Sequence, residues 1–148
     1  MTKNSIRLKL IGKNIEDLKT ISPYCQDSII KIKDLVYLKE NKIFLMMLSR
    51  FMWEDIEKGI FRNYKRIISV LKFNFIENVL VKNINQQHKT RNLELLAIKT
   101  SFNQKNMYDI NLIFSGNSIM LLKSEEIDVM VDDQEYFWEV KNSPKHKL

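Results

Sequence analysis

The feature of this sequence that most constrains its fold is a regular alternation of apolar and polar residues, repeated in several segments. In the segment 108–114 every second residue is large and apolar, and Asp109 and Asn111 lie between such residues. A period of two places successive side chains on opposite faces of a β-strand. Short polar turns separate the segments, so consecutive strands are expected to pair as antiparallel hairpins.

The alternation predicts eight or nine strands. We expect them at 6–11, 28–33, 35–38, 43–48, 67–75, 79–84, 93–102, 108–114 and 119–123. The segment 43–48 is apolar on both faces, which predicts a central strand buried on two sides. The segment 124–133 fits a strand through Ile127, Val129 and Val131. It also fits a helix through Ile127, Met130 and Val131. We favour the strand.

Two short helices are expected beside the strands. Asn14 is a suitable N-cap for a helix over 15–22, because its side chain can accept a hydrogen bond from the first turn. Pro23 then either ends this helix or starts another turn. A second short helix is expected near 51–58, and Gly59 is a suitable residue to end it.

Together these elements predict an α+β fold class dominated by antiparallel strands in sequential hairpins. The strands are expected to form either a curved sheet with helices packed on it or a partly closed barrel. A chain of 148 residues is the size of one ordinary domain, and 45% apolar residues are enough to fill a core. We therefore expect a single domain over 1–148, with a frayed tail at 142–148.

The same sequence indicates a soluble protein of a reducing compartment. No segment is apolar over the roughly 18–20 residues that span a bilayer. Lysine and arginine interrupt the first residues, unlike the apolar region of a secretory signal. Cys25 is the only cysteine, which excludes a disulfide within the chain. The expected location is the cytoplasm, and no membrane partner is expected.

The protein is basic, and its charge is unevenly distributed. The net charge is +6, yet residues 106–148 carry 4 basic and 8 acidic side chains, so the excess of positive charge lies in residues 1–105. Lysine supplies 19 of the 24 basic residues, and lysine contacts phosphates and bases less specifically than arginine does. We expect a solvated basic surface that binds nucleic acid weakly and non-specifically, if it binds nucleic acid at all.

The sequence contains none of the usual patterns of a metal, nucleotide or nucleophile site. His88 lies in a polar loop and His146 in the tail, and with one cysteine they give no zinc-like spacing. The three glycines are isolated, so they cannot form a glycine-rich phosphate loop. Cys25 is expected to be buried and inert. We expect no catalytic residue, no cofactor and no metal.

Polar and aromatic residues are densest around the expected strand 43–48 and its neighbours. This candidate cluster comprises Asp27, Asp34, Tyr37, Arg50, Trp53 and Glu54. A buried guanidinium at Arg50 would need carboxylate partners, and the nearest by expected strand pairing are Asp27, Asp34 and Glu54. Two interpretations stay open: an ion-pair network that holds the structure together, or a small polar pocket for a ligand or substrate.

Three stretches resemble a known family of uncharacterised proteins. They are LKLIGKNIEDL at 8–18, QDSIIKIKDLVYL at 26–38, and RFMWE at 50–54, which fits the element R-F-x-W-E. All three resemble an alphaproteobacterial family catalogued as domain of unknown function 2948. This sequence has Lys33 where that family has glycine before the aspartate. The resemblance implies a cytoplasmic bacterial protein, and it supplies no activity, cofactor or catalytic residue.

Three functions are compatible with these observations. The first is a non-enzymatic binding or interaction module, whose protein partner would use exposed aromatic residues and a strand edge. The second is a non-specific nucleic-acid binder that uses the basic body of the chain. The third is a small-ligand protein or enzyme that uses the cluster around Arg50. One continuous positive face would favour the second, and a concave pocket that contains the cluster would favour the third.

Overall fold

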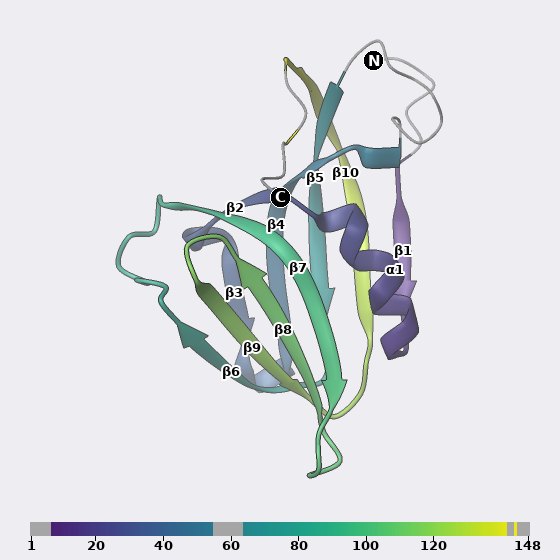
Figure 1. The fold of residues 1–148 in the computed structure, drawn as a ribbon, viewed down its shortest axis with the longest axis vertical. Helices are drawn as coiled ribbons and strands as arrows, with labels where there is room; N and C mark the ends of the chain where they lie inside the picture. Colours follow the sequence, from purple (N-terminus) through teal and green to yellow (C-terminus); the bar gives the residue numbers. More distant parts are fainter. Residues whose placement is uncertain (1–6, 55–63, 142–143, 145–148) are drawn as a thin grey trace.

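A computed structural model describes residues 7–54, 64–141 and 144. In these residues ten strands form one antiparallel sheet that does not close on itself (Figure 1). The strand order is β1-β10-β5-β4-β2-β7-β8-β9-β6, and β3 is a further partner of β4. The strands are β1 (Lys9–Gly12), β2 (Ser28–Lys31), β3 (Leu35–Leu38), β4 (Ile43–Phe51), β5 (Tyr64–Phe73), β6 (Ile76–Lys82), β7 (Asn92–Phe102), β8 (Tyr108–Phe114), β9 (Ser118–Ser124) and β10 (Val129–Val140).

The sheet curls, so that its two halves face each other. In Figure 1, β4, β5 and β10 form the rear half, and β6, β7, β8 and β9 form the front half. The short strand β2 joins the halves, because it pairs with β4 in the rear and with β7 in the front. The curl turns one face of each half inward, and those faces carry the apolar residues of the alternating pattern.

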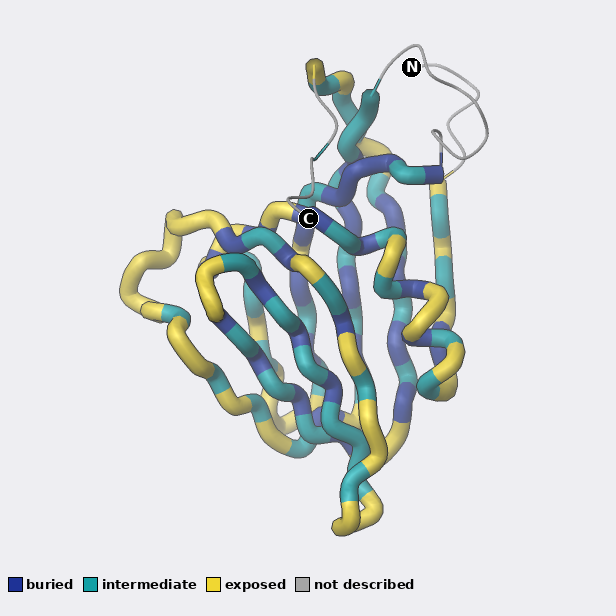
Figure 2. Tube along the Cα trace, viewed as in Figure 1, coloured by how far each residue is buried: buried dark blue, intermediate teal, exposed yellow. Residues whose placement is uncertain are grey.

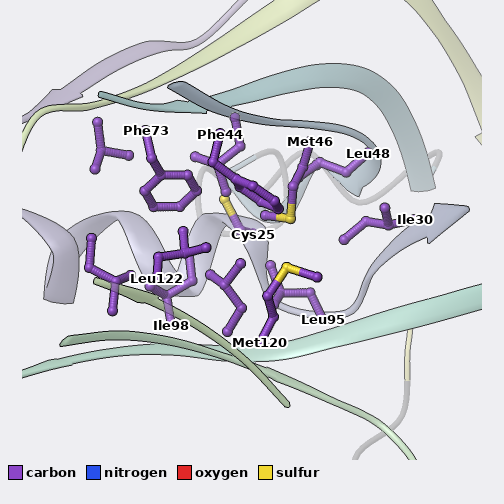
Figure 3. Packing of buried hydrophobic residues seen from close by; sticks show 14 of the residues in the cluster. Cys25, Ile30, Phe44, Met46, Leu48, Phe73, Leu95, Ile98, Met120 and Leu122 are labelled. Carbon is purple, nitrogen blue, oxygen red and sulfur yellow. The ribbon is translucent and has the colours of Figure 1, made fainter. Parts of the chain in front are cut away.

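Large apolar side chains from both halves fill the space between them (Figure 3). Phe44, Met46 and Phe73 come from the rear half, and Leu95 and Leu122 come from the front. All five are at most 2% exposed. Figure 2 shows the same alternation of buried and more exposed residues along the strands. The period of two in the sequence therefore marks which residues enter the core.

The helix α1 (Ile15–Cys25) packs against β7 and β1 on one side of the curled sheet. Asn14 is its N-cap, as expected, and its Oδ1 accepts a hydrogen bond of 2.8 Å from the backbone N–H of Asp17. The helix continues past Pro23, because a proline in the last turn removes only one hydrogen bond close to the helix end. Among the described residues no helix is long and apolar enough to cross a membrane.

Cys25 ends α1 and is fully buried in the core, as the sequence indicated. Burial raises the pKa of its thiol to about 12. The thiol is therefore protonated at neutral pH, and a protonated thiol is a poor nucleophile. Cys25 packs as a small apolar residue between the two halves of the sheet.

Replacing Asn14 by alanine is expected to lower the free energy of unfolding by about 1 kcal/mol, because the first turn of α1 loses its side-chain acceptor. Chemical denaturation of the wild type and the Asn14→Ala variant measures the difference. Asn14→Asp is the matched control, since aspartate also caps helices, and its stability is expected to stay within a few tenths of the wild type. Equal losses in both variants would contradict the capping role.

The pairing of the strands differs in part from the expected sequential hairpins. Four neighbouring pairs do form hairpins, namely β3–β4, β4–β5, β7–β8 and β8–β9. In contrast, β6 pairs with β9, and β10 pairs with both β5 and β1. The expected strand in 124–133 is confirmed, and it begins at Val129. The longer-range pairs arise because the chain crosses between the two halves, from β5 to β6 and from β9 to β10.

Two further expectations need correction. The segment 43–48 lies in a central strand, but Met47 is 47% exposed, so the strand is buried on one side only. The reason is that the outer face of this antiparallel sheet meets solvent. The expected helix near 51–58 is also wrong in its first two residues, because Phe51 belongs to β4, Met52 is not helical, and helical conformation starts at Trp53. Residues 55–58, and most of the expected tail 142–148, lie outside the described residues.

Candidate functional site

Arg50 lies on the inner face of β4 and is the largest fully buried side chain among the described residues. Its Nη1 and Nη2 donate to Oε1 and Oε2 of Glu54 at 2.8 and 2.7 Å. Its Nε and Nη2 donate to Oδ1 and Oδ2 of Asp133 at 3.1 and 2.8 Å. Nη1 also donates to the carbonyl of Phe51 at 3.3 Å. A guanidinium has five N–H donors, and these five bonds match that number.

Asp133 is the deepest carboxylate of this network, and its side chain is 0% exposed. It reaches Arg50 across β5, where Ser69 is its partner in the strand register. The hydroxyl of Ser69 donates to Oδ1 of Asp133, and the backbone N–H of Leu8 donates to Oδ2 at 2.8 Å. Both oxygens of Asp133 therefore accept two hydrogen bonds each, which compensates the carboxylate for its loss of water.

The electrostatics of the network keep Arg50 charged. Burial lowers the pKa of Arg50, but the hydrogen bonds and the negative charges of Glu54 and Asp133 outweigh burial and raise the pKa above its ordinary value. The network thus holds one cation between two anions, with the hydrogen-bonding capacity of the guanidinium in use. A ligand would have to displace a carboxylate to reach Arg50. This geometry fits a structural ion-pair network.

The sequence analysis named Glu54 as a partner of Arg50 but did not include Asp133. Arg50 and Asp133 are 83 positions apart, and the pairing of β10 with β5 brings them together. A signal for Asp133 exists in the sequence, because it continues the inward series of Val129 and Val131 on β10. A carboxylate in line with buried valines indicates a buried cationic partner.

Asp27 and Trp53 make other contacts near the end of β4. Asp27 is buried with a φ of 63°, and its backbone N–H donates to the carbonyl of Leu95 at 2.7 Å. The carbonyl of Asp27 accepts from Nη1 of Arg66 at 3.3 Å. The indole N–H of Trp53 donates to the carbonyl of Gln26 at 2.9 Å. These bonds fix the link between α1 and β2 against the neighbouring strands.

Asp34 and Tyr37 lie in another part of the molecule. Asp34 ends the 3-10 turn η1 (Ile32–Asp34) and is half-buried. Tyr37 on β3 pairs with Phe44, six residues before Arg50 on β4, which corresponds to roughly 20 Å along a strand. The hydroxyl of Tyr37 donates to the carbonyl of Ile76 at 2.9 Å. The six candidate residues therefore do not converge on one pocket.

A cavity of about 480 Å³ lies where β3 faces β6, and we call it the seam cavity. Its walls come from residues of both strands, of the turn that precedes β3 and of the segment that follows β6, over a floor of core side chains. The lining residues are Ile32, Lys33, Leu35, Tyr37, Phe44, Val79, Val81, Ile84, Gln86, Lys89 and Met120. Pockets that bind small molecules have volumes of about 300–1,000 Å³ and mostly apolar walls, so both the size and the lining suit a ligand.

The seam cavity exists because β3 and β6 approach each other without pairing. Among the described strands, β3 pairs with β4 and β6 pairs with β9. At one end of the seam the backbone N–H of Ile76 donates to the carbonyl of Lys42 at 2.8 Å. At the other end the backbone N–H of Lys33 donates to the carbonyl of Lys89 at 2.9 Å. The two ends are tied, and the middle of the seam stays open over the cavity.

The seam cavity was not predicted from the sequence, although part of a signal for it was present. Val79, Val81 and Ile84 were expected in a strand, and all three are only half-buried although they pack on the core. Such residues mark the rim of a core that no further strand covers. Which strand would face them depends on the curl of the sheet, and that curl is not visible in the local pattern.

Comparison with known proteins places the chain in a family. The family model described as Protein of unknown function (DUF2948) matches residues 8–146. The chain belongs to this family. The resemblance seen in three stretches of the sequence is thereby confirmed, and the match covers nearly the whole of this DUF2948 chain. No curated protein and no solved structure matches it.

Membership of the DUF2948 family does not assign a role to any residue. Within the described ranges, no group of three or more histidine, cysteine, aspartate or glutamate side chains could hold a metal ion. The Arg50 network is saturated by its own carboxylates. The seam cavity is therefore the candidate functional site of this DUF2948 protein.

Proposed function

We propose that this DUF2948 protein is a non-enzymatic binding module and that it holds a small apolar ligand in the seam cavity. The observation that carries the proposal is the cavity of about 480 Å³ between two strand edges that face each other. Apolar residues of β3 and β6 form its walls, and they stay half-buried where a further layer of core would otherwise cover them. A ligand chain in this place would complete the core.

The lining favours binding over chemistry. Its polar side chains are Lys33, Tyr37, Gln86 and Lys89. The hydroxyl of Tyr37 already donates to the carbonyl of Ile76, so it serves to tie β3 to β6. The remaining three are exposed side chains of the rim. Such a cavity provides apolar contact in its interior and polar contact at its opening, as carrier and sensor proteins do.

The tied ends of the seam favour a small ligand over a peptide strand. A peptide that added to the edges of β3 and β6 would need to run along the seam between them. The hydrogen bonds from Ile76 to Lys42 and from Lys33 to Lys89 cross its path at the two ends. A small molecule enters the open middle and leaves both bonds in place.

Binding of linear alcohols of increasing length tests the proposal. Each added CH₂ group that enters the cavity is expected to make the binding free energy more favourable by about 0.8 kcal/mol. We expect the affinity to rise about fourfold per CH₂ group and then to level off when the cavity is full. Displacement of an environment-sensitive fluorescent probe such as anilinonaphthalene sulfonate measures the affinities. An affinity that does not depend on chain length would argue against an apolar cavity site.

A pair of tryptophan variants on one strand tests the location. Val81 lines the cavity, whereas the neighbouring Leu80 points outward and is 48% exposed. We expect Val81→Trp to weaken decanol binding by about tenfold or more, because the indole occupies the space of the ligand. Leu80→Trp is the matched control and is expected to bind decanol like the wild type. Circular dichroism checks that both variants are folded, and Ile84→Trp replaces Val81→Trp if the latter is not. Equal binding by the cavity-filling and control variants would refute the proposed site.

A further inference from the structure

We infer that the ligand of the seam cavity is an amphiphile with one alkyl chain and an anionic head group, and that Lys33 and Lys89 bind the head group. This inference rests on the proposed function and adds the chemistry and the orientation of the ligand. Lys33 and Lys89 both line the cavity, and both are exposed at its rim. The apolar walls would receive the alkyl chain.

The backbone brings the two lysines together. The N–H of Lys33 donates to the carbonyl of Lys89 at 2.9 Å, and the next bond in this ladder joins Ile32 to Arg91 at 3.1 Å. Two residues whose backbones are hydrogen-bonded in this way can direct their side chains toward the same point. Lys33 and Lys89 are 56 positions apart in the sequence, so only the folding of the loop before β7 onto η1 places them at one opening.

The charges of the two lysines are not compensated locally. In the part of the chain that the structure describes, the ion pairs involve other basic residues, and neither Lys33 nor Lys89 lies within 4.0 Å of a carboxylate. Two ammonium groups at one opening repel each other, and an anion placed between them relieves that repulsion. The structure thus supplies an anion site directly beside an apolar cavity.

The two ends of the seam differ in charge, which sets the orientation of the ligand. At the end opposite to the two lysines, Lys42 Nζ lies 2.6 Å from Glu77 Oε1. The hydrogen bond to Glu77 raises the pKa of Lys42, and the bond to Lys42 lowers the pKa of Glu77, so both stay charged and compensate each other. Among the described residues that line the cavity, the cationic side chains are Lys33 and Lys89, so an anionic head is expected at their end of the seam.

Lysine is a point charge and does not require the planar, two-oxygen geometry that arginine prefers. A carboxylate and a phosphate therefore suit the site equally, and the shared chemistry is a single alkyl chain with an anionic head. Decanoate represents a fatty acid, decyl phosphate represents a phosphorylated lipid, and decanol has the same chain with an uncharged head. The three compounds separate the contribution of the head from that of the chain.

The test compares these three ligands on the wild type and on Lys33→Ala/Lys89→Ala by probe displacement. We expect the wild type to bind decanoate or decyl phosphate about tenfold more tightly than decanol, and we expect the double variant to lose this difference while its affinity for decanol is unchanged. Lys33→Ala/Lys105→Ala removes the same charge from the protein and is the control, because Lys105 lies in the exposed turn after β7. The control keeps one of the two lysines. It is therefore expected to retain roughly half of the difference in binding free energy between the anionic ligands and decanol.

The possible results distinguish this inference from the function on which it rests. If decanol and decanoate bind equally well to the wild type, and Val81→Trp blocks both, the cavity is a ligand site but the head-group assignment is wrong. If Val81→Trp blocks neither, the proposed function itself fails. If the double variant and its control lose the preference equally, a general surface potential and not the pair Lys33 and Lys89 attracts the anion. A preference for only one of the two anionic heads would identify the source of the ligand.

Discussion

Replacing Arg50 by alanine is expected to lower the free energy of unfolding by about 3–5 kcal/mol, the usual loss when one partner of a buried ion pair is removed. The variant leaves the carboxylates of Glu54 and Asp133 close together without the cation between them. It also leaves a void, because Arg50 is the largest fully buried side chain of the described residues. Urea or guanidinium denaturation of the two proteins measures the loss.

An exposed arginine provides the control for this experiment. Arg7 lies 3.8 Å from Glu135, and their side chains are 53% and 85% exposed. Arg7→Ala is expected to change stability by no more than about 0.5 kcal/mol, as is usual for surface ion pairs. A loss below about 1 kcal/mol for Arg50→Ala with an intact fold would contradict the structural role of the network and would return it to consideration as a ligand site.

Asp133→Ala is expected to destabilise the protein by about 3–5 kcal/mol and by more than Glu54→Ala does. Asp133 accepts hydrogen bonds from Arg50, Ser69 and the backbone of Leu8, and all of these donors lose their partner together. Glu54 bonds to Arg50 alone in this network, and its side chain is 8% exposed, so water can replace part of its contribution.

Denaturation of the two single variants and of the double variant Glu54→Ala/Asp133→Ala tests this order. Because both residues contact the same guanidinium, their effects are expected to be non-additive. The double loss should exceed the sum of the single losses, since Arg50 then has no carboxylate partner. Equal losses from the single variants, or strict additivity, would contradict the arrangement in which both anions share one buried cation.

The parts of the structure that follow from local pattern could be predicted from the sequence. The N-cap at Asn14 and the inward series on β8 depend on neighbouring residues, and both are present as expected. The partner Asp133 could not be assigned to Arg50, because the pairing of β10 with β5 depends on how the sheet curls. The two-sided burial expected for 43–48 failed for a related reason: apolar composition alone does not tell which face of a strand meets solvent.

The candidate site was harder to predict because it arises where two strands do not pair. Six residues were expected to form one cluster. The structure joins Arg50 and Glu54 of that set by hydrogen bonds, whereas Tyr37 lies at the opposite end of β4. Tyr37 instead lines the seam cavity, together with residues of β6 that follow it by more than 40 positions. The separation between the edges of β3 and β6 depends on the tied ends of the seam and on the core beneath it. The alternation of apolar and polar residues along a strand predicts neither the hydrogen bonds at the ends of the seam nor the packing of the core beneath it.

In our proposal the seam cavity binds the ligand and the Arg50 network is structural. The measurement that tests it most directly is the change in backbone amide chemical shifts of the ¹⁵N-labelled protein on addition of decanoate. We expect the largest changes on β3, β6 and the segment 83–91, with Val81 and Lys89 among them, and no change at Arg50 and Asp133. Largest changes around Arg50, or changes spread over the outer face of the sheet, would contradict the proposal.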